Sequence, residues 1–177
     1  FNLIKDTFPK LHLIIAGEGP EEQNLKNIVR EYSLQDKVTF TGVVEFKEGM
    51  SLLKGAEMTV VPSRSEGGGL VNIEAQASGC PVIASRVGGI PEYVKDGESG
   101  ILFNTGNFQE LADKISTLLT NKILREKIVE GGYKHAQNFS WDMLAPQYID
   151  LYEKAIASYD KNKNFKPWSD LTIGLWD

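Results

Sequence analysis

The sequence predicts an α/β fold in which a parallel, Rossmann-like sheet carries helices on both faces. Two observations lead to this prediction. Short apolar segments of strand length alternate with segments of helical periodicity along most of the chain. Glycine-bearing turns also follow three of the expected strands, at the ends where open parallel sheets bind their ligands.

The expected strands are short apolar runs bounded by glycine, proline or polar residues. They span residues 11–16, 37–42, 57–62, 81–85 and 100–103. Strands that alternate with helices in this way form parallel sheets covered on both faces.

The expected helices lie between and after these strands. After the first strand, Pro20 suits the first helical position, and Leu25, Ile28, Val29 and Tyr32 then form an apolar face. Further helices are expected at 46–55, 70–77, 107–119, 121–138 and 140–159, with a short one from 88 to about 97. Residues 1–10 are interpreted as the end of a helix stopped by a proline.

Length and composition indicate one ordinary globular domain. The chain has 177 residues, of which 41% are apolar and 24% charged. A net charge of −5 gives no general attraction to nucleic acid or anionic lipid. The single cysteine, Cys80, excludes an internal disulfide. The sequence shows no signal peptide and no membrane-spanning segment. We therefore expect a cytoplasmic protein that associates with a membrane only through a longer parent protein.

The segment that leads from the third strand into the next helix is the best candidate for a ligand site. The apolar run Met58–Val61 is followed by three glycines, Gly67–Gly69, and a helix is expected to begin at Leu70. Free N–H groups at a helix start bind anions. Glu66 and Glu74 bracket the glycines, which suits a ligand carrying hydroxyls beside phosphate, such as a nucleotide sugar.

Several of these features also have a plainer interpretation. Glu74 lies in a small, apolar helix that should be substantially covered, so it could be a structural acid bonded to the backbone. Gly17 and Gly19 lack the third glycine of a dinucleotide fingerprint, because Glu22 stands there, and could form only a tight turn. Gly88–Gly89 either starts a helix or lets a ligand approach the backbone closely.

The remaining charged and metal-ligating residues suggest no further site. Arg64 and Arg86 are the cations nearest to the glycines and could be plain surface charges. His12 and His135 are expected to be a structural strand residue and a helix-surface residue. No group of His, Cys, Asp and Glu has metal-ligand spacing, so neither a metal nor a cofactor is expected.

Five motifs follow one another along the chain. They are Pro62-Ser63-x-x-Glu66-Gly67-x-Gly69-Leu70-x-x-x-Glu74-Ala75, Ala77-x-Gly79-x-Pro81-Val82-Ile83-Ala84, Gly88-Gly89-Ile90-Pro91-Glu92, Gly97-x-x-Gly100-x-Leu102-Phe103 and Phe139-Ser140-Trp141. In this order they resemble family 4 of the retaining glycosyltransferases, which are GT-B enzymes with two Rossmann-like domains. The resemblance covers roughly residues 8–157 and identifies the chain as the C-terminal, donor-binding half.

The resemblance implies a role for each candidate residue. Glu66 would contact hydroxyls of the donor sugar as the catalytic residue, and Glu74 would hold the ribose hydroxyls. Backbone amides around the helix start would hold the diphosphate. The implied donor-binding residues are Gly17, Gly19, Val43, Glu66, Gly67, Gly68, Gly69, Leu70, Val71 and Glu74.

The implied function is to bind the donor for transfer of a hexose, with retained anomeric configuration, from a UDP- or GDP-sugar. The acceptor would be a glycan or a lipid-linked molecule, as in polysaccharide biosynthesis. Two alternatives stay open. One is a nucleotide-sugar 2-epimerase on the same scaffold, and the other is a non-catalytic binding or assembly module that needs a separate acceptor domain.

The sequence departs from the family pattern in three ways. Gly68 stands where the family often has an aromatic side chain, which predicts a more mobile loop and a more open sugar pocket. The first strand of the domain, with the Arg and Lys that follow it, is missing. The N-terminal, acceptor-binding domain is missing too. We therefore expect weak nucleotide binding and no transfer by this chain alone.

The missing strand would lie at the centre of the sheet, between the strands at 11–16 and 57–62. An empty slot there would leave backbone groups unpaired. In the tail, Leu171, Ile173 and Leu175 alternate as in a strand. The hypothesis is that residues 171–176, from the same chain or from a neighbouring copy, fill the slot. The chain then divides into a nucleotide-sugar-binding domain, 1–160, and a tail, 161–177.

Overall fold

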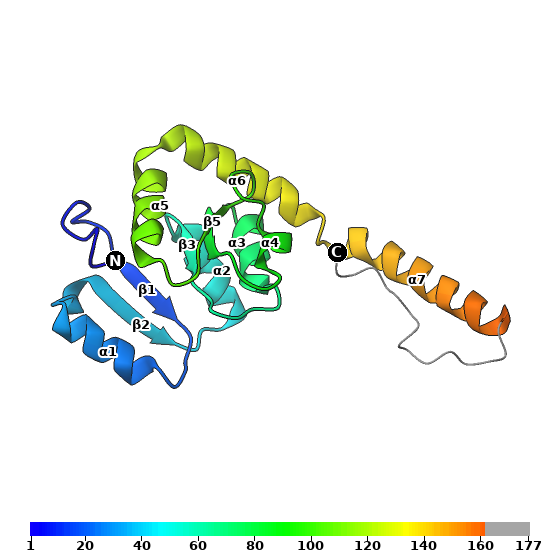
Figure 1. The fold of residues 1–177 in the computed structure, drawn as a ribbon, viewed down its shortest axis with the longest axis horizontal. Coiled ribbons are helices and arrows are strands. Elements are labelled where there is room, and N and C mark those ends of the chain that lie inside the picture. Colours follow the sequence, from blue (N-terminus) through cyan, green and yellow to red (C-terminus); the bar gives the residue numbers. More distant parts are fainter. Residues whose placement is uncertain (162–177) are drawn as a thin grey trace. The chain divides into compact units, whose positions relative to one another are not determined.

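A computed structural model describes residues 1–161, and the chain divides into two compact units, Phe1–Gln137 and Asn138–Asp177. Figure 1 shows strands and helices alternating through the first unit. The helix expected at 140–159 belongs to the second unit. The predicted end of the nucleotide-sugar-binding domain at residue 160 depends on which residues bind the ligand, and it stays a prediction.

The first unit confirms the predicted order of strands and of the main helices. Its strands are β1 (Leu13–Ala16), β2 (Val38–Gly42), β3 (Thr59–Val61), β4 (Val82–Ser85) and β5 (Ile101–Phe103). Its helices are α1 (Glu22–Glu31), α2 (Phe46–Gly55), α3 (Leu70–Ala77), α4 (Ile90–Tyr93), α5 (Phe108–Thr120) and α6 (Lys122–Gln137), with a 3-10 turn at Gln35–Lys37.

Two local predictions are wrong. Residues 1–10 form successive turns instead of the end of a helix, because a segment this short that stops at Pro9 cannot sustain one. Helix α4 ends at Tyr93 instead of near Gly97. The backbone of Val94 is already extended, with φ −132°, and the amide of Gly97 donates to the carbonyl of Gly100 in a turn.

The three-stranded parallel sheet β3-β4-β5 has a helical layer on each face, as predicted. Successive strand residues point to opposite faces, so neighbours along β4 and β5 enter different cores. One core joins Val61, Val82, Ala84 and Leu102 to Leu53 of α2, Ala75 of α3 and Ile90 of α4. The other joins Ile83, Ile101 and Phe103 to Leu111, Ile115 and Leu118 of α5 and Leu124 and Ile128 of α6.

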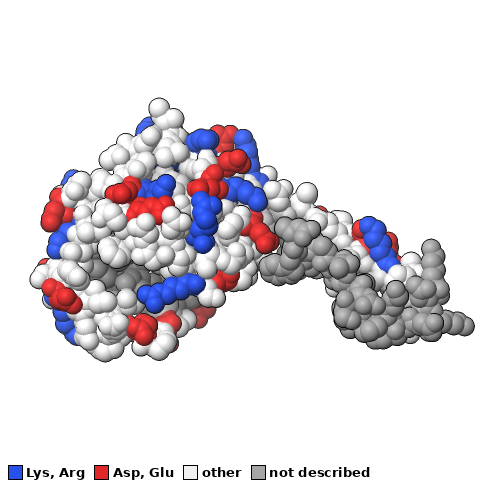
Figure 2. Space-filling view, viewed as in Figure 1, with Lys and Arg blue, Asp and Glu red and all other residues white. Residues whose placement is uncertain are grey.

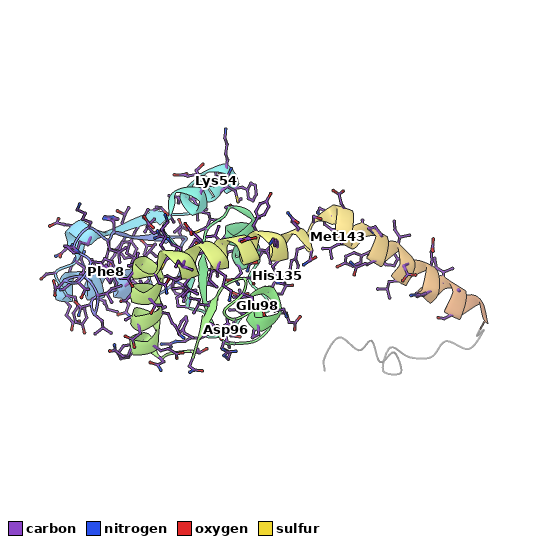
Figure 3. The ribbon with its side chains drawn as sticks, turned by 90° about the horizontal axis from the view of Figure 1, so that it is seen from above. Phe8, Lys54, Asp96, Glu98, His135 and Met143 are labelled. Atoms are coloured by element: carbon purple, nitrogen blue, oxygen red, sulfur yellow. The ribbon has the colours of Figure 1, made fainter. Side chains whose placement is uncertain are left out.

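Two small residues let α6 approach the sheet edge closely. A Cβ atom added to Gly131 would overlap the carbonyl oxygen of Glu98, and one on Gly132 would lie 3.0 Å from that of Ser99 and 3.1 Å from Cγ of Gln76. Figure 3 shows Glu98 on the loop before β5, beside α6. Helix α6 thereby supports both that loop and α3.

The strands β1 and β2 form a separate parallel pair. Among the described residues, β1 pairs with β2 alone and β3 with β4 alone, so each has an edge without a strand. A hollow of about 490 Å³ is lined by residues that precede these two strands, such as Leu11 and Glu57, and by Leu119 of α5 and Arg125 of α6. The sheet is therefore interrupted between β1 and β3, where the sequence predicts an empty slot.

In the second unit, α7 (Trp141–Lys161) carries a largely exposed apolar face. Tyr148 and Tyr152 lie one turn apart on it, with ring centroids 6.5 Å apart. Trp141 and Ile156 are 76% and 62% exposed. Across residues 1–161, no helix combines the length and apolar character that a membrane span requires. The tail segment 171–176 lies outside the described residues.

We expect that deleting Lys166–Asp177 lowers the melting temperature by about 5–10 °C, as measured by circular dichroism. The hypothesis gives the reason: if residues 171–176 fill the slot, they cover the open edges of β1 and β3, and burying a few of their apolar side chains contributes about 2–3 kcal/mol.

The matched full-length variant Leu171→Ser/Ile173→Ser/Leu175→Ser keeps the length of the chain and should show the same decrease. The control Asp170→Asn leaves the apolar face intact and should not. An unchanged melting temperature after the deletion contradicts the hypothesis.

Candidate functional site

The loop between β3 and α3 presents a helix start to solvent. Gly69 is the N-cap residue, with φ 70° and ψ 84°, a left-handed conformation that favours glycine. Its carbonyl accepts a hydrogen bond from the amide of Asn72 at 2.9 Å. The amides of Leu70 and Val71 thus belong to the first turn, where a helix offers them no acceptor. The side chain of Leu70 is 70% exposed.

The loop after β4 packs directly against this loop, backbone to backbone. The amide of Gly89 donates to the carbonyl of Glu66 at 3.2 Å. A Cβ atom on Gly88 would overlap that carbonyl oxygen, and one on Gly89 would overlap the carbonyl oxygen of Gly67. The sequence suggests that a ligand could approach the backbone at Gly88–Gly89. In the structure, the backbone of Glu66 and Gly67 occupies that place.

The carboxylate of Glu66 is oriented by two serines. The hydroxyl of Ser63 donates to Oε2 of Glu66 at 3.4 Å. Ser63 is in turn held by the buried Ser85 at the end of β4, whose hydroxyl donates to the Ser63 carbonyl at 2.6 Å. Glu66 is half-buried, and this arrangement leaves most of its acceptor capacity available.

Glu74 lies beside the buried face of α3. The buried residues of α3 are Asn72, Ala75 and Gln76, and Glu74 is half-buried. The helix is thus covered on one side, and Glu74 is partly covered, in agreement with the sequence-based expectation. Within residues 1–161 the carboxylate of Glu74 accepts no hydrogen bond from the protein, so the fold itself does not satisfy it.

Two buried amides on α3, which sequence reasoning missed, fasten the surrounding loops. Nδ2 of Asn72 donates to the carbonyl of Gly68 at 3.1 Å, and Nε2 of Gln76 donates to the carbonyl of Tyr93 at 2.8 Å. Their side-chain oxygens are buried without a partner in the described structure. Amides four residues apart in an otherwise small, apolar helix are the sequence signal that could have revealed them.

Gly17, Gly19 and Val43 lie at the carboxyl ends of the β1–β2 pair. Gly17 has φ 114° and donates its amide to the carbonyl of Gly42 at 2.8 Å. Gly19 accepts from the amide of Glu22 at 3.1 Å as α1 begins, and Val43 is 71% exposed. The structure brings these three together on the pair, whereas residues 66–74 form the loop and helix start that follow β3 of the three-stranded sheet.

Neither nearby arginine is tied to the glycine loop. Arg86 forms an ion pair with Asp96, whose other oxygen accepts from the amide of Leu102 at 2.9 Å. Arg64 is exposed. On the face drawn in Figure 2, acidic and basic side chains of the first unit are interspersed.

Histidines and acidic residues form no metal cluster in the part of the chain that the structure describes. His12 bonds the hydroxyl of Thr39 at 2.8 Å, between the β1 and β2 segments. The absence of a metal requirement stays a prediction.

Cys80 is a structural residue behind α3. It is 3% exposed, and its sulfur lies 3.1 Å from the hydroxyl of Thr59. Burial raises the pKa of the thiol above its ordinary value of 9.0, against the opposing effect of the Thr59 hydrogen bond. The thiol is therefore protonated at neutral pH and is not a nucleophile.

Fold and site together define a Rossmann-like α/β domain with a solvent-facing helix start flanked by two acids. The sequence profile of the family "Glycosyl transferases group 1" matches residues 1–135, so the chain belongs to this family.

Relatives in sequence and structure agree with that membership. The chain is 36% identical over 159 residues to D-inositol 3-phosphate glycosyltransferase of Corynebacterium glutamicum, covering 87% of this chain and 38% of that protein. It superimposes on sucrose-phosphate synthase of Thermosynechococcus elongatus with a TM-score of 0.79 and 32% identity, over 89% of this chain and 41% of the other.

A third relative has been solved with a ligand. Anabaena HepE, in complex with UDP-glucose, matches with a TM-score of 0.75 and 25% identity, over 82% of this chain and 42% of that one. The architecture is thus that of the GT-B glycosyltransferases, and the chain spans about two fifths of the length of these relatives.

We expect Gly89→Ala to reduce the free energy of unfolding by about 2–4 kcal/mol, because its Cβ atom has no room beside the carbonyl of Gly67. Urea denaturation measures this. Gly55→Ala is the matched control, since a Cβ atom there meets nothing within 4 Å, and it should not destabilise the protein. Equal stability of Gly89→Ala and wild type would contradict the backbone contact.

Proposed function

We propose that the first unit binds the nucleotide-sugar donor of a retaining hexosyltransferase of family 4. The observation that supports this most is the segment 62–77, where a solvent-facing helix start, a glycine loop and two carboxylates occur together. The amides around Gly69–Val71 bind the diphosphate, Glu74 binds the ribose hydroxyls, and Glu66 binds the sugar.

The role of Glu74 follows from its open acceptor capacity. A vicinal diol offers two hydroxyl donors to one carboxylate, and hydrogen bonds to an ionised acceptor are about twice as strong as neutral ones. Because the protein supplies no donor to Glu74 within the described residues, a ribose would satisfy it without displacing an internal contact.

The role of the helix start is electrostatic. Negative charge grows on the diphosphate as it leaves, and first-turn amides together with the positive end of α3 stabilise that charge. This contribution increases toward the transition state and requires no metal. Glu66, oriented through Ser63, fixes the sugar so that the acceptor attacks from the face that the diphosphate leaves.

The donor is a UDP- or GDP-hexose, with the base near Val43, and the acceptor is a glycan or lipid-linked molecule of polysaccharide biosynthesis. The binding of UDP-glucose by HepE supports a uridine donor. The acceptor-binding domain is the proposed partner, in a cytoplasmic parent enzyme. The interrupted sheet supports the proposal that another segment of polypeptide completes it, since β1 and β3 each have an open strand edge.

Calorimetric titration with UDP, GDP and ADP tests the donor site. Wild type should bind one of them with a dissociation constant above 1 µM (about −8 kcal/mol), because within residues 1–161 no lysine or arginine is bonded to the glycine loop and Arg86 is paired with Asp96. Glu74→Ala should weaken that binding roughly 10- to 100-fold through the loss of charge-assisted hydrogen bonds.

Glu48→Ala is the control, since Glu48 is an exposed acid on α2, and it should bind as wild type does. If wild type binds none of the three nucleotides, the donor-site proposal fails for this chain. A sub-micromolar constant would contradict the weak binding.

One alternative keeps the same site without catalysis. In this alternative the chain would be a non-catalytic binding module that works with a separate acceptor domain. Transfer activity on adding an acceptor domain in trans, lost in Glu66→Ala, would distinguish the catalytic from the non-catalytic reading.

A further inference from the structure

Gly68 packs directly against the ring of Tyr93. Its φ lies outside the left-handed region, unlike that of Gly69, so the backbone conformation admits any residue. A Cβ atom at position 68, however, would overlap the ring of Tyr93, lying 2.7 Å from Cζ and 3.0 Å from Cδ2. The ring of Tyr93, which comes from the end of α4, fills the volume that a side chain at 68 would occupy.

The contact between Gly68 and Tyr93 is held at both ends by α3. The carbonyl of Gly68 accepts from Asn72, and the carbonyl of Tyr93 accepts from Gln76. Both amides are buried, 0% and 1% exposed, and they lie one turn apart on the same face of the helix. The four residues Gly68, Asn72, Gln76 and Tyr93 therefore connect the glycine loop, α3 and the end of α4.

The glycine loop also contacts the side chain of Glu66. A Cβ atom on Gly69 would lie 3.3 Å from Cγ of Glu66, so the backbone next to Gly68 packs on the side chain of that acid. Three consecutive glycines have more conformational freedom than any other triplet. Without the ring of Tyr93 against Gly68, the segment between Glu66 and the first turn of α3 would have to be ordered by the ligand.

We propose that Tyr93 is a positioning residue for the donor sugar. Its ring orders the glycine loop and thereby sets Glu66 relative to the diphosphate-binding amides of α3. The inference rests on the proposed function, in which Glu66 contacts the sugar. The diphosphate depends chiefly on the first-turn amides of Leu70 and Val71, and their helix α3 is anchored in the core by Ala75. Tyr93 should therefore affect recognition of the sugar more than that of the nucleotide.

The test compares UDP-glucose with UDP, and GDP-mannose with GDP, on the full chain by calorimetry. Tyr93→Ala should weaken the sugar nucleotide roughly tenfold, the cost of ordering the freed glycines, and change the nucleoside diphosphate by less than about twofold. Tyr93→Phe keeps the ring and should bind as wild type does. Nitrogen-15 relaxation of Gly67–Gly69 should show increased motion in Tyr93→Ala and not in Tyr93→Phe.

A double-mutant cycle isolates the contact itself. Gly68→Ala should reproduce the loss on its own and add nothing to Tyr93→Ala, because the ring that it displaces is already gone. The proposal is overturned if Tyr93→Ala binds the sugar nucleotide normally, if it weakens both ligands equally, or if the two losses add. Wild type that binds neither sugar nucleotide would instead contradict the proposed function, and this inference with it.

Discussion

The backbone contact between residues 66–67 and 88–89 is the constraint on which the site depends. It joins the loops that follow two neighbouring strands, β3 and β4, at a distance that only glycine permits on one side. Because the carbonyl of Glu66 is held there, the loop must pass from that point to the left-handed Gly69 in two residues. The position of the acid and the start of α3 are both consequences of this approach.

The buried amides of Asn72 and Gln76 add specificity at an energetic cost. Each donates one good hydrogen bond while its side-chain oxygen stays buried without a partner in the described structure. A buried, unsatisfied acceptor costs about 1–3 kcal/mol. An apolar α3 would thus pack at least as well, but it would leave the loop and α4 without a tie to the helix between them.

Sequence periodicity predicted the order of strands and helices because the helices carry regular apolar faces and the strands are short apolar runs, of which β4 is buried on both faces. The motif around Glu66–Glu74 predicted the strand–loop–helix turn because its glycines and acids have few other uses. The bonds of Asn72 and Gln76, the partner of Gly88–Gly89 and the contact of Tyr93 with Gly68 could not be predicted. Each depends on which segments that are distant in the sequence approach one another in the fold. The composition of a segment does not indicate which other segment it contacts.

The interruption between β1 and β3 bears directly on ligand binding. The residues predicted to lie near the nucleotide, Gly17, Gly19 and Val43, lie on the β1–β2 pair, whereas those predicted for the diphosphate and sugars lie on the loop and helix that follow β3 of the three-stranded sheet. A strand inserted between β1 and β3 would bond to both and set their separation. A nucleotide bound as proposed would reach both groups and be sensitive to that separation, so strand insertion and nucleotide binding would be coupled, each changing the other by the same free energy. In the proposed function, completion of the sheet would therefore be part of the donor site.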